Sequence, residues 1–253
     1  MCLISLAWQS HPSYSLILVA NRDEYHARPS LPIHHWEGAP EITGGKDLQA
    51  GGSWLAVSSK GRFATVTNFR EGIPEPARLS RGALIREFLL SAKSPEQFNQ
   101  QLAQNKHLYG GFNLLLGDES HLFYCSNRSN LATNLNPGIY SLSNHLLDTP
   151  WPKADYAKQQ LTELLKQDQI STTRLIQMMQ NADQFDDALL PYTGVGLERE
   201  RTLSPPFIIS DDYGTRCTTV MLWRRDRKIE LVEQNYHADG SEGERLEHLI
   251  SLD

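Results

Sequence analysis

The chain has 253 residues, of which 21% are charged and 40% are apolar, and its formal net charge is −6. This composition is ordinary for a globular protein, and we expect one domain spanning residues 1–253. The net negative charge and the lack of a strong basic cluster argue against a nucleic-acid-binding surface. No apolar run reaches the ~20 residues of a membrane span, so we expect no stable membrane insertion.

The chain contains three cysteines, Cys2, Cys125 and Cys217, and none of them belongs to a CxxC pair. An odd number at these spacings argues against a disulfide framework and against a Cys-rich zinc site. The first residues lack the basic start and the long apolar region of a signal peptide. Together these features favour a reducing compartment and predict a cytoplasmic protein.

The first two dozen residues predict a β-hairpin. Residues 3–8 and 14–20 are apolar strands, and residues 9–13 form a polar turn that contains Pro12. A turn centred on His11 and Pro12 places Cys2 opposite Asn21, and a slip of one or two residues places it opposite Arg22 or Asp23. In each register a thiol lies beside an amide, a guanidinium or a carboxylate.

Cys2 becomes chemically unusual if Met1 is removed, because one residue then carries a thiol and a free α-amine. An α-amine has an ordinary pKa of about 7.7–8.0, so part of it is neutral near pH 7 and can accept a proton. A nearby cation such as Arg22 favours the thiolate, which is the nucleophile. The alternative is that Cys2 is a small apolar residue at the start of a strand.

Residues 21–40 are expected to form a loop-rich stretch broken by three prolines. Its histidines, His26, His34 and His35, lack a metal-binding pattern, so we interpret them as solvated or packing residues and expect no metal site. The glycines of residues 44–52 predict tight turns near a pocket. Trp54 follows them as a wall of that pocket or as a core residue.

Two asparagines lie at predicted strand ends. Asn68 follows a strand at 63–67, and Asn144 follows a strand at 139–142. Each is either a pocket-facing amide or a turn residue. Arg216, which opens a strand at 217–223, is likewise either functional or an exposed residue at the start of that strand.

Further strands are predicted at 54–57, 112–116, 122–125, 207–210 and 229–234. Helical patterns occur at 83–89, 95–102, 153–166 and 172–180, and Ser94-Pro95-Glu96 is typical of a helix start. Residues 183–187 and 194–196 are expected to form a surface loop near the pocket rim. This order predicts antiparallel sheets with helices packed outside them, an α+β class.

A set of short motifs resembles the NRDE family, the family of transport and Golgi organisation protein 2, over nearly the whole chain. The motifs are Met1-Cys2, His11-Pro12, Asn21-Arg22-Asp23-Glu24, Arg28-Pro29, Trp36-Glu37, Gly51-Gly52-Ser53-Trp54, Thr67-Asn68-Phe69-Arg70, Ser80-Arg81-Gly82, Trp151-Pro152-Lys153 and Tyr213-Gly214-Thr215-Arg216. That family is grouped with the N-terminal-nucleophile hydrolases. The resemblance therefore implies a four-layer αββα sandwich of antiparallel sheets.

The wider resemblance to choloylglycine hydrolases and penicillin V acylases implies roles for individual residues. Cys2 would attack an amide, Asp23 would orient its amine, Asn68 and Asn144 would bind the oxyanion and the amine, and Arg216 would support the site. Supporting or substrate-binding roles fall to Asn21, Arg22, Trp54 and Arg70. Those enzymes carry an Arg three residues before the Asp, where this chain has Ala20. Arg22 could take the place of that Arg, but strand alternation points Arg22 to the opposite face from Asp23.

Two functional hypotheses follow. The first is a hydrolase of acyl amides that uses Cys2 as nucleophile and an oxyanion hole that includes Asn68 or Asn144. The second is a non-catalytic protein that binds or carries haem or an acyl lipid, functions to which the family has been linked. A c-type haem motif such as CxxCH is absent. We expect no resident cofactor, and a small-molecule ligand in either case.

Overall fold

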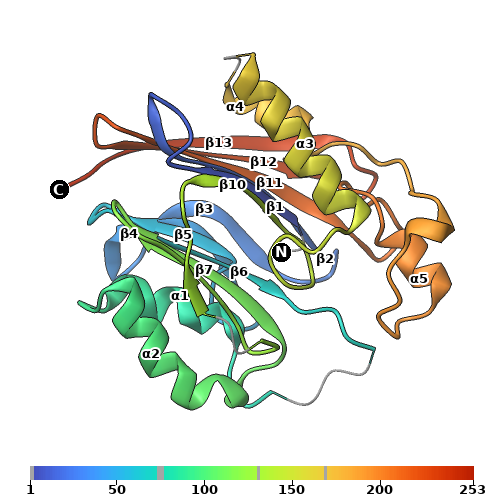
Figure 1. Ribbon diagram of the computed structural model, residues 1–253, viewed down its shortest axis with the longest axis horizontal. Helices are drawn as coiled ribbons and strands as arrows, with labels where there is room; N and C mark the ends of the chain where they lie inside the picture. The colour runs from blue at the N-terminus through green and yellow to red at the C-terminus, as the bar shows by residue number, and fades with distance from the viewer. Residues whose placement is uncertain (1–2, 73–76, 130–131, 168–169) are drawn as a thin grey trace.

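The structure is a computed structural model that describes residues 3–72, 77–129, 132–167 and 170–253. Its described strands form two antiparallel sheets stacked face to face (Figure 1). The six-stranded first sheet has the spatial order β10 (Gly138–Leu142), β1 (Leu3–Trp8), β2 (Tyr14–Tyr25), β11 (Tyr213–Arg224), β12 (Lys228–Tyr236) and β13 (Glu242–Ser251).

The second sheet has seven strands in sequence order. They are β3 (Ser30–Trp36), β4 (Ala39–Asp47), β5 (Leu55–Ser58), β6 (Arg62–Asn68), β7 (Phe112–Asp118), β8 (Leu122–Ser126) and β9 (Ala132–Asn134). Each strand pairs with its neighbour in the chain, so most connections are short hairpins. The long exception joins β6 to β7 through α1 (Arg81–Leu90), α2 (Pro95–Asn105) and η1 (Lys106–Leu108).

Helices cover the outer face of each sheet. α1 and α2 lie on the second sheet, and α3 (Pro152–Lys166) and α4 (Thr172–Gln177) lie on the first (Figure 1). η2 (Asp187–Leu189) and α5 (Leu197–Thr202) lie between α4 and β11 in the chain, and α5 sits at one end of the sandwich. Three hydrophobic clusters separate the four layers, one between the sheets and one beneath each helical pair. The predicted α+β, four-layer αββα architecture is confirmed.

β2 shows why the sequence adopts this layering. Residues 15–23 are buried on both faces of the strand. Leu16 and Leu18 belong to the cluster between the sheets, while Ile17 and Val19 belong to the cluster beneath α3 and α4. A strand covered on both faces requires an unbroken apolar run rather than alternation, which is what residues 16–20 provide.

The N-terminal hairpin is confirmed, with Leu3 paired with Asn21 and Trp8 with Leu16. Because Asn21 pairs with Leu3, the predicted register that places Cys2 opposite Asn21 is wrong. Cys2 itself lies outside the described residues. The helix predicted from Ser94 is confirmed as α2, whose first turn has a reciprocal capping box between Ser94 and Gln97.

Several secondary-structure elements were predicted wrongly from the sequence or were not predicted. Residues 21–40 are mostly strand rather than loop. β2 continues to Tyr25, and after it β3 pairs with β4 in the second sheet. Gly44 and Gly45 lie within β4, where their missing side chains make room for Ala56 and for the Trp54 ring. Residues 207–210 form no strand. β9, β13 and α5 lie in stretches for which no element was predicted.

In the described part of the chain, no helix is long and apolar enough to cross a membrane.

Candidate active site

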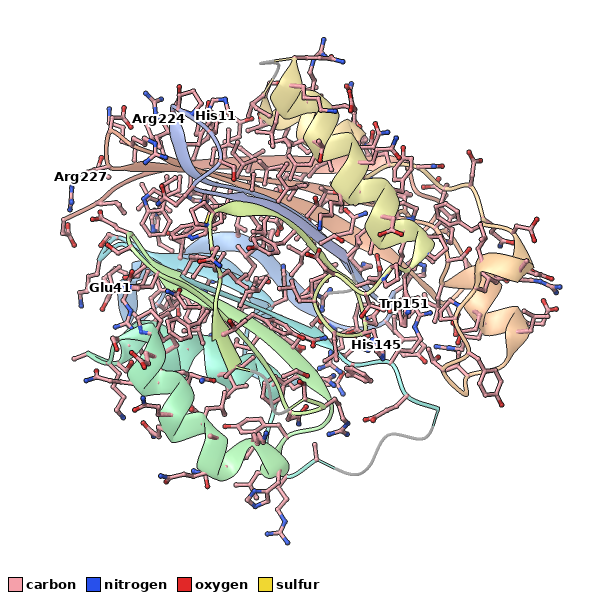
Figure 2. All side chains as sticks on the ribbon, viewed as in Figure 1. His11, Glu41, His145, Trp151, Arg224 and Arg227 are labelled. Atoms are coloured by element: carbon pink, nitrogen blue, oxygen red, sulfur yellow. The ribbon has the colours of Figure 1, made fainter. Side chains whose placement is uncertain are left out.

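A cavity of about 920 Å³ opens where β2 and β6 end. Its wall also includes the residues before and at the start of α1, residues 52–54 and the segment around α5. Figure 2 places His145 and Trp151 at this end of the molecule, near α5, and His11, Arg224 and Arg227 at the opposite end. Six of the predicted site residues line the cavity: Arg22, Asp23, Trp54, Asn68, Arg70 and Asn144.

The predicted nucleophile, Cys2, lies outside the described residues. The first described residue, Leu3, pairs with Asn21 of β2, and Ile4 pairs with Leu142 of β10. The start of β1 is therefore flanked by the strand end that carries Arg22 and Asp23. On its other side lies β10, which ends two residues before Asn144.

Asp23 is held by the neighbouring strand β11. Thr215 donates its hydroxyl to Asp23 Oδ1 at 2.7 Å, and the same hydroxyl accepts the Ile208 main-chain N–H at 2.9 Å. The carboxyl is 2% exposed. Asn21 faces the same side of β2 but lies deeper, where its amide donates to the carbonyl oxygens of Met179 and Pro206. Asn21 therefore joins β2 to the segment that follows α4 and does not line the cavity.

Arg22 points to the opposite face of β2, between the two sheets. Its guanidinium carbon lies 4.3 Å from the centre of the Trp54 ring, a cation–π geometry. The side chain is 3% exposed, and its Nη1 forms no hydrogen bond within the described part of the chain. Ala20 lies on this same face, in the cluster between the sheets. Arg22 thus lies on the same face of β2 as Ala20, one pleat nearer the strand end.

Asn68 and Asn144 are brought together by the ends of β6 and β10. Asn144 Nδ2 donates to Asn68 Oδ1 at 2.9 Å and to the Asn68 carbonyl oxygen at 3.2 Å. The Arg70 main-chain N–H donates to the Asn144 carbonyl oxygen at 2.7 Å. Arg70 Nη2 donates to Asn144 Oδ1 at 3.4 Å. The two predicted oxyanion-binding amides therefore form one unit with Arg70.

Arg216 lies beside the cavity without lining it. It is the extra residue of a bulge in β11, because Thr215 pairs with Asp23 and Cys217 pairs with Arg22. Its Nη1 donates to the carbonyl oxygens of Tyr25 and His26, both at 3.0 Å. Burial, together with the charge of Arg22, lowers the pKa of the Arg216 guanidinium. Arg216 thus fixes the turn that follows β2.

Charged side chains make up much of the cavity wall, and the sequence analysis singled out only some of them. Its described lining includes seven cationic side chains, Arg22, Arg28, Arg70, Arg78, Arg81, Lys153 and Arg199, and four acidic ones, Asp23, Glu24, Asp47 and Glu71. Lys153 is 2% exposed and donates to the Leu203 carbonyl oxygen at 3.0 Å. The sequence did carry a signal for four of the others, because Glu24, Arg28, Arg81 and Lys153 belong to motifs of the family resemblance.

A buried acidic residue, Glu200 of α5, was also missed. Its Oε2 lies 2.7 Å from Arg70 Nη1, and the two side chains are 3% and 7% exposed. No local pattern marks Glu200, because the sequence around it, residues 197–202, reads as a charged, exposed turn of helix.

The three histidines for which no metal site was expected each contact a polar group of the protein. His26 contacts the Ser210 carbonyl oxygen, His34 the Pro32 carbonyl oxygen, and His35 the Thr43 hydroxyl. Among the described residues, no group of three or more His, Cys, Asp or Glu side chains is arranged to hold a metal ion.

Comparison with known proteins finds relatives that match nearly the whole chain. The family model for Transport and Golgi organisation 2 matches residues 1–238. The Transport and Golgi organization 2 homolog of Mus musculus is 32% identical, with 98% of this chain and 94% of the relative covered. The Homo sapiens homolog is 30% identical, with 93% of each chain covered.

A solved structure with a similar fold is a variant of conjugated bile acid hydrolase from Clostridium perfringens. Its TM-score is 0.50 at 10% sequence identity, with 99% of this chain and 98% of that chain covered. At this identity the likeness concerns the fold alone, which is N-terminal-nucleophile-hydrolase-like. With the family model matched over residues 1–238 and relatives aligned over nearly their full length, the chain belongs to the Transport and Golgi organisation 2 family.

Proposed function

We propose that the protein is an N-terminal cysteine hydrolase that cleaves the C–N bond of an acyl amide. The observation that carries this proposal is the convergence of Arg22, Asp23, Asn68 and Asn144 on one cavity beside the start of β1. A nucleophile there would have a carboxylate, a guanidinium and two side-chain amides around it. Groups of this kind can activate a nucleophile and stabilise an oxyanion in acyl transfer.

The proposed reaction begins after removal of Met1. The Cys2 α-amine takes the thiol proton, Sγ attacks the amide carbonyl, and the developing oxyanion accepts hydrogen bonds from an asparagine amide. The C–N bond then breaks, and the proton held by the α-amine passes to the leaving nitrogen. Water, deprotonated by the same α-amine, hydrolyses the resulting thioester and releases the acid.

The other two thiols make this proposal directly testable, because they should be unreactive. Burial raises the pKa of Cys125 to about 12. Burial, together with Glu233, raises the pKa of Cys217 well above its ordinary range. Since the thiolate is the reactive form, a thiol reagent at pH 7 should modify Cys2 and spare both buried residues.

The test combines intact-mass analysis with labelling by an electrophilic β-lactone. Protein from its native host should lack Met1 and should gain one acyl adduct, mapped by peptide sequencing to Cys2. Cys2→Ala should gain none, whereas the matched control Cys125→Ala should be labelled like the wild type. Retention of Met1, or an adduct confined to another residue, would overturn the hydrolase proposal.

A second candidate function, the binding of an acyl lipid or haem without turnover, is favoured by the size and charge of the cavity. About 920 Å³ is room for a ligand of lipid or porphyrin size, and cationic side chains outnumber acidic ones in its described wall. A Soret shift on haem addition that is lost in Cys2→Ala would favour this function. Release of free acid from an amide substrate would favour hydrolysis.

A further inference from the structure

Two buried hydrogen-bond donors in the cavity wall, Arg22 Nη1 and Trp54 Nε1, have no acceptor within the described part of the chain. The two side chains are 3% and 5% exposed, and both line the cavity. They also lie against each other, because the Arg22 guanidinium carbon is 4.3 Å from the centre of the Trp54 ring. A buried donor without an acceptor is costly. Two such donors side by side in one wall indicate a place for the acceptor atoms of a ligand.

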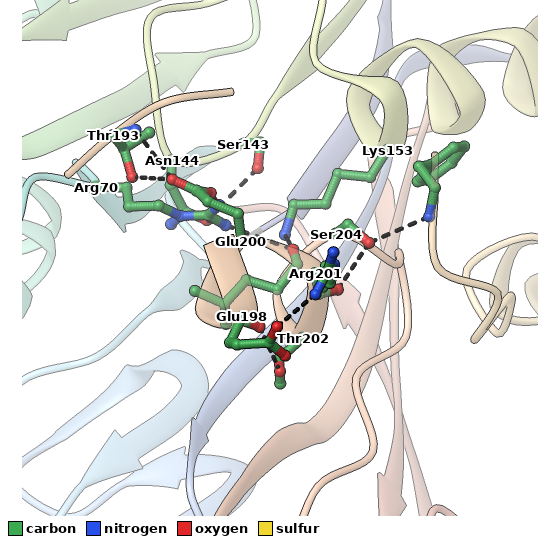
Figure 3. A network of polar contacts seen from close by, with 12 residues as sticks. Arg70, Ser143, Asn144, Lys153, Thr193, Glu198, Glu200, Arg201, Thr202 and Ser204 are labelled. Carbon is green, nitrogen blue, oxygen red and sulfur yellow. Dashed lines mark hydrogen bonds and ion pairs between the residues drawn. The ribbon is translucent and has the colours of Figure 1, made fainter. Parts of the chain in front are cut away.

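Arg22 also lacks a counter-charge. Arg28 and Arg70 of the same wall form ion pairs with Asp47 and Glu200, each at 2.7 Å. Figure 3 shows the second of these pairs. Arg22 forms no ion pair with any residue that the structure describes, although its side chain is buried as deeply as those of the Arg70–Glu200 pair. A buried cation without a partner is costly, and an anionic ligand group would remove this cost.

Neighbouring charged groups do not neutralise Arg22. Asp23 follows it in the chain but faces the other side of β2, where the Thr215 hydroxyl binds it. Glu233 is fully buried, and burial raises the pKa of its carboxyl in spite of the charge of Arg22, so the charged form is disfavoured. Arg216 adds a second cation, and its pKa is lowered by burial and by the charge of Arg22. The surroundings of Arg22 therefore favour an anion.

The Trp54 ring is held in place from behind. It lies against Gly45 of β4, where a Cβ would come within 2.1 Å of the ring. The Trp54 main-chain oxygen accepts the Thr65 hydroxyl at 2.9 Å. Trp36 offers a comparison, because its indole N–H donates to the Gly44 carbonyl oxygen at 3.0 Å. The described part of the chain thus supplies an acceptor to the Trp36 indole and none to the Trp54 indole.

We propose that Arg22 and Trp54 form an anion-binding subsite, and that the acyl amide taken by the cavity carries a carboxylate or phosphate group. Guanidinium and indole N–H groups can only donate hydrogen bonds, and such anions offer several acceptor oxygens. Asn21 pairs with Leu3, so Arg22 lies beside the start of β1, near the position of the proposed nucleophile. The choice of an amide rests on the proposed hydrolase function, whereas the binding of an anion does not.

Three dodecanoyl ligands test the charge of the ligand with little change in its size. N-dodecanoylglycine carries a carboxylate, and N-dodecanoylglycinamide has a neutral amide of nearly the same shape in its place. N-dodecanoyl-O-phosphoethanolamine carries a phosphate, and its affinity shows which of the two anions the subsite prefers. Isothermal titration calorimetry measures binding to Cys2→Ala protein, in which turnover by Cys2 cannot consume the ligand.

N-dodecanoylglycine, or the phosphate ligand, should bind about 10–100-fold more tightly than the glycinamide, the range expected for hydrogen bonds to a charged group. Arg22→Met should abolish this preference, and Arg22→Lys, which keeps the charge, should retain part of it. Arg62→Met is the matched control. Arg62 stacks on the Phe88 ring at 4.0 Å but is not part of the described cavity wall, so its loss should leave the preference unchanged.

The preference is a ratio measured within each variant, so a general loss of stability does not imitate its disappearance. Equal affinities for the anionic and neutral ligands, a preference that survives Arg22→Met, or no binding of any of the three would overturn the proposal. Failure of the hydrolase proposal is seen separately, as absence of a Cys2 adduct in the wild type, and leaves the binding result to decide the anion-binding subsite.

The second readout is NMR of protein labelled with ¹⁵N at tryptophan. Trp54→Phe and Trp36→Phe assign the two indole N–H signals, and Trp54→Phe also keeps a ring beneath Arg22. The bound anion should shift the Trp54 signal and leave the Trp36 signal unchanged, because the Trp36 N–H already has its acceptor. An unchanged Trp54 signal in the ligand-saturated protein would overturn the role of Trp54 and would mean that water, rather than a ligand, satisfies its N–H.

Discussion

The two halves of the cavity wall are held in place by different means. Arg22, Asp23 and Thr67 lie in strands, so continuous ladders of main-chain hydrogen bonds set their positions. The half around α5 is carried by irregular chain and one short helix, and side chains attach it. Glu200 holds Thr193 and Arg70, and Lys153 holds the Leu203 carbonyl oxygen. Single substitutions should therefore perturb the α5 half of the wall and leave the two sheets intact.

Phe63→Ala should give the largest effect and should act on the strand half. Phe63 is fully buried between the sheets and meets Trp223 edge-on with ring centres 6.2 Å apart. Removing the ring leaves a cavity that two paired sheets cannot close, which costs about 3–5 kcal/mol of unfolding free energy. Urea denaturation followed by tryptophan fluorescence measures the loss. A loss below about 1 kcal/mol would contradict the assignment of Phe63 to a tightly packed core.

Glu200→Ala should act on the α5 half. It leaves the Arg70 guanidinium buried without its carboxylate, which typically costs about 3–5 kcal/mol. We expect the lower end of this range, because α5 can open locally and admit water to Arg70. Amide hydrogen exchange should therefore rise around residues 193–203 while β2 and β6 remain protected. Equal loss of protection in the strands would show that the two halves unfold together.

The double variant Arg70→Met with Glu200→Leu sharpens this result. It removes both charges and fills the space with apolar side chains, a change that is often neutral or stabilising in buried ion pairs. Its unfolding free energy should lie well above that of Glu200→Ala. If both variants are equally destabilised, the loss in Glu200→Ala comes from packing rather than from an uncompensated charge.

The same contrast explains what the sequence could predict. β1 and β2 were found because their apolar runs and the Pro12 turn are local signals. Asn68 and Asn144 were noticed because each follows a predicted strand, but only the family resemblance implied a role for them. β3 and β4 were missed because Pro32 and Pro40 and the paired glycines read as turns. In the structure Pro32 lies in the edge strand β3, and β4, which carries Pro40 and the glycines, pairs with β3 and with β5.

Glu200 could not be found in the same way. Its role depends on Arg70, which lies 130 residues away, and a charged helix turn gives no periodic sign of burial. Glu233 shows the same limit. It lies in a strand that was predicted, yet its full burial between the sheets follows only from the packing of β12 against β3.

Glu233 provides a pH test within the strand half. It accepts from the Ile33 main-chain N–H and the Thr219 hydroxyl, both at 3.1 Å. Burial raises the pKa of this carboxyl, and those hydrogen bonds oppose the rise only in part. The folded protein therefore retains the proton to higher pH than the unfolded chain. The stability that this provides is complete below the unfolded pKa of about 4.3 and is lost as pH rises through the folded value.

Glu233→Gln has no titratable proton at this position, so it should not lose this stability as pH rises. As pH rises from 4 to 8, the unfolding free energy of the variant should increase relative to that of the wild type. The increase should be about 1.4 kcal/mol for each pH unit by which folding raises the pKa of Glu233. Urea unfolding at three pH values across this range measures the difference. A difference that stays constant with pH would show that the carboxyl titrates alike in the folded and unfolded states.

Asp187→Asn should give the smallest effect, although Asp187 lies in the same segment as Glu200. Its carboxylate pairs with Arg201 at 2.5 Å on an exposed surface. The hydrogen bond from Arg201 lowers the pKa of Asp187, so any stabilisation is present near neutral pH and fades as pH falls. Solvent screens such a pair, and we expect unchanged urea midpoints and unchanged exchange at residues 193–203. A loss that approaches that of Glu200→Ala would mean that surface charges, and not only the buried pair, hold the α5 half of the wall.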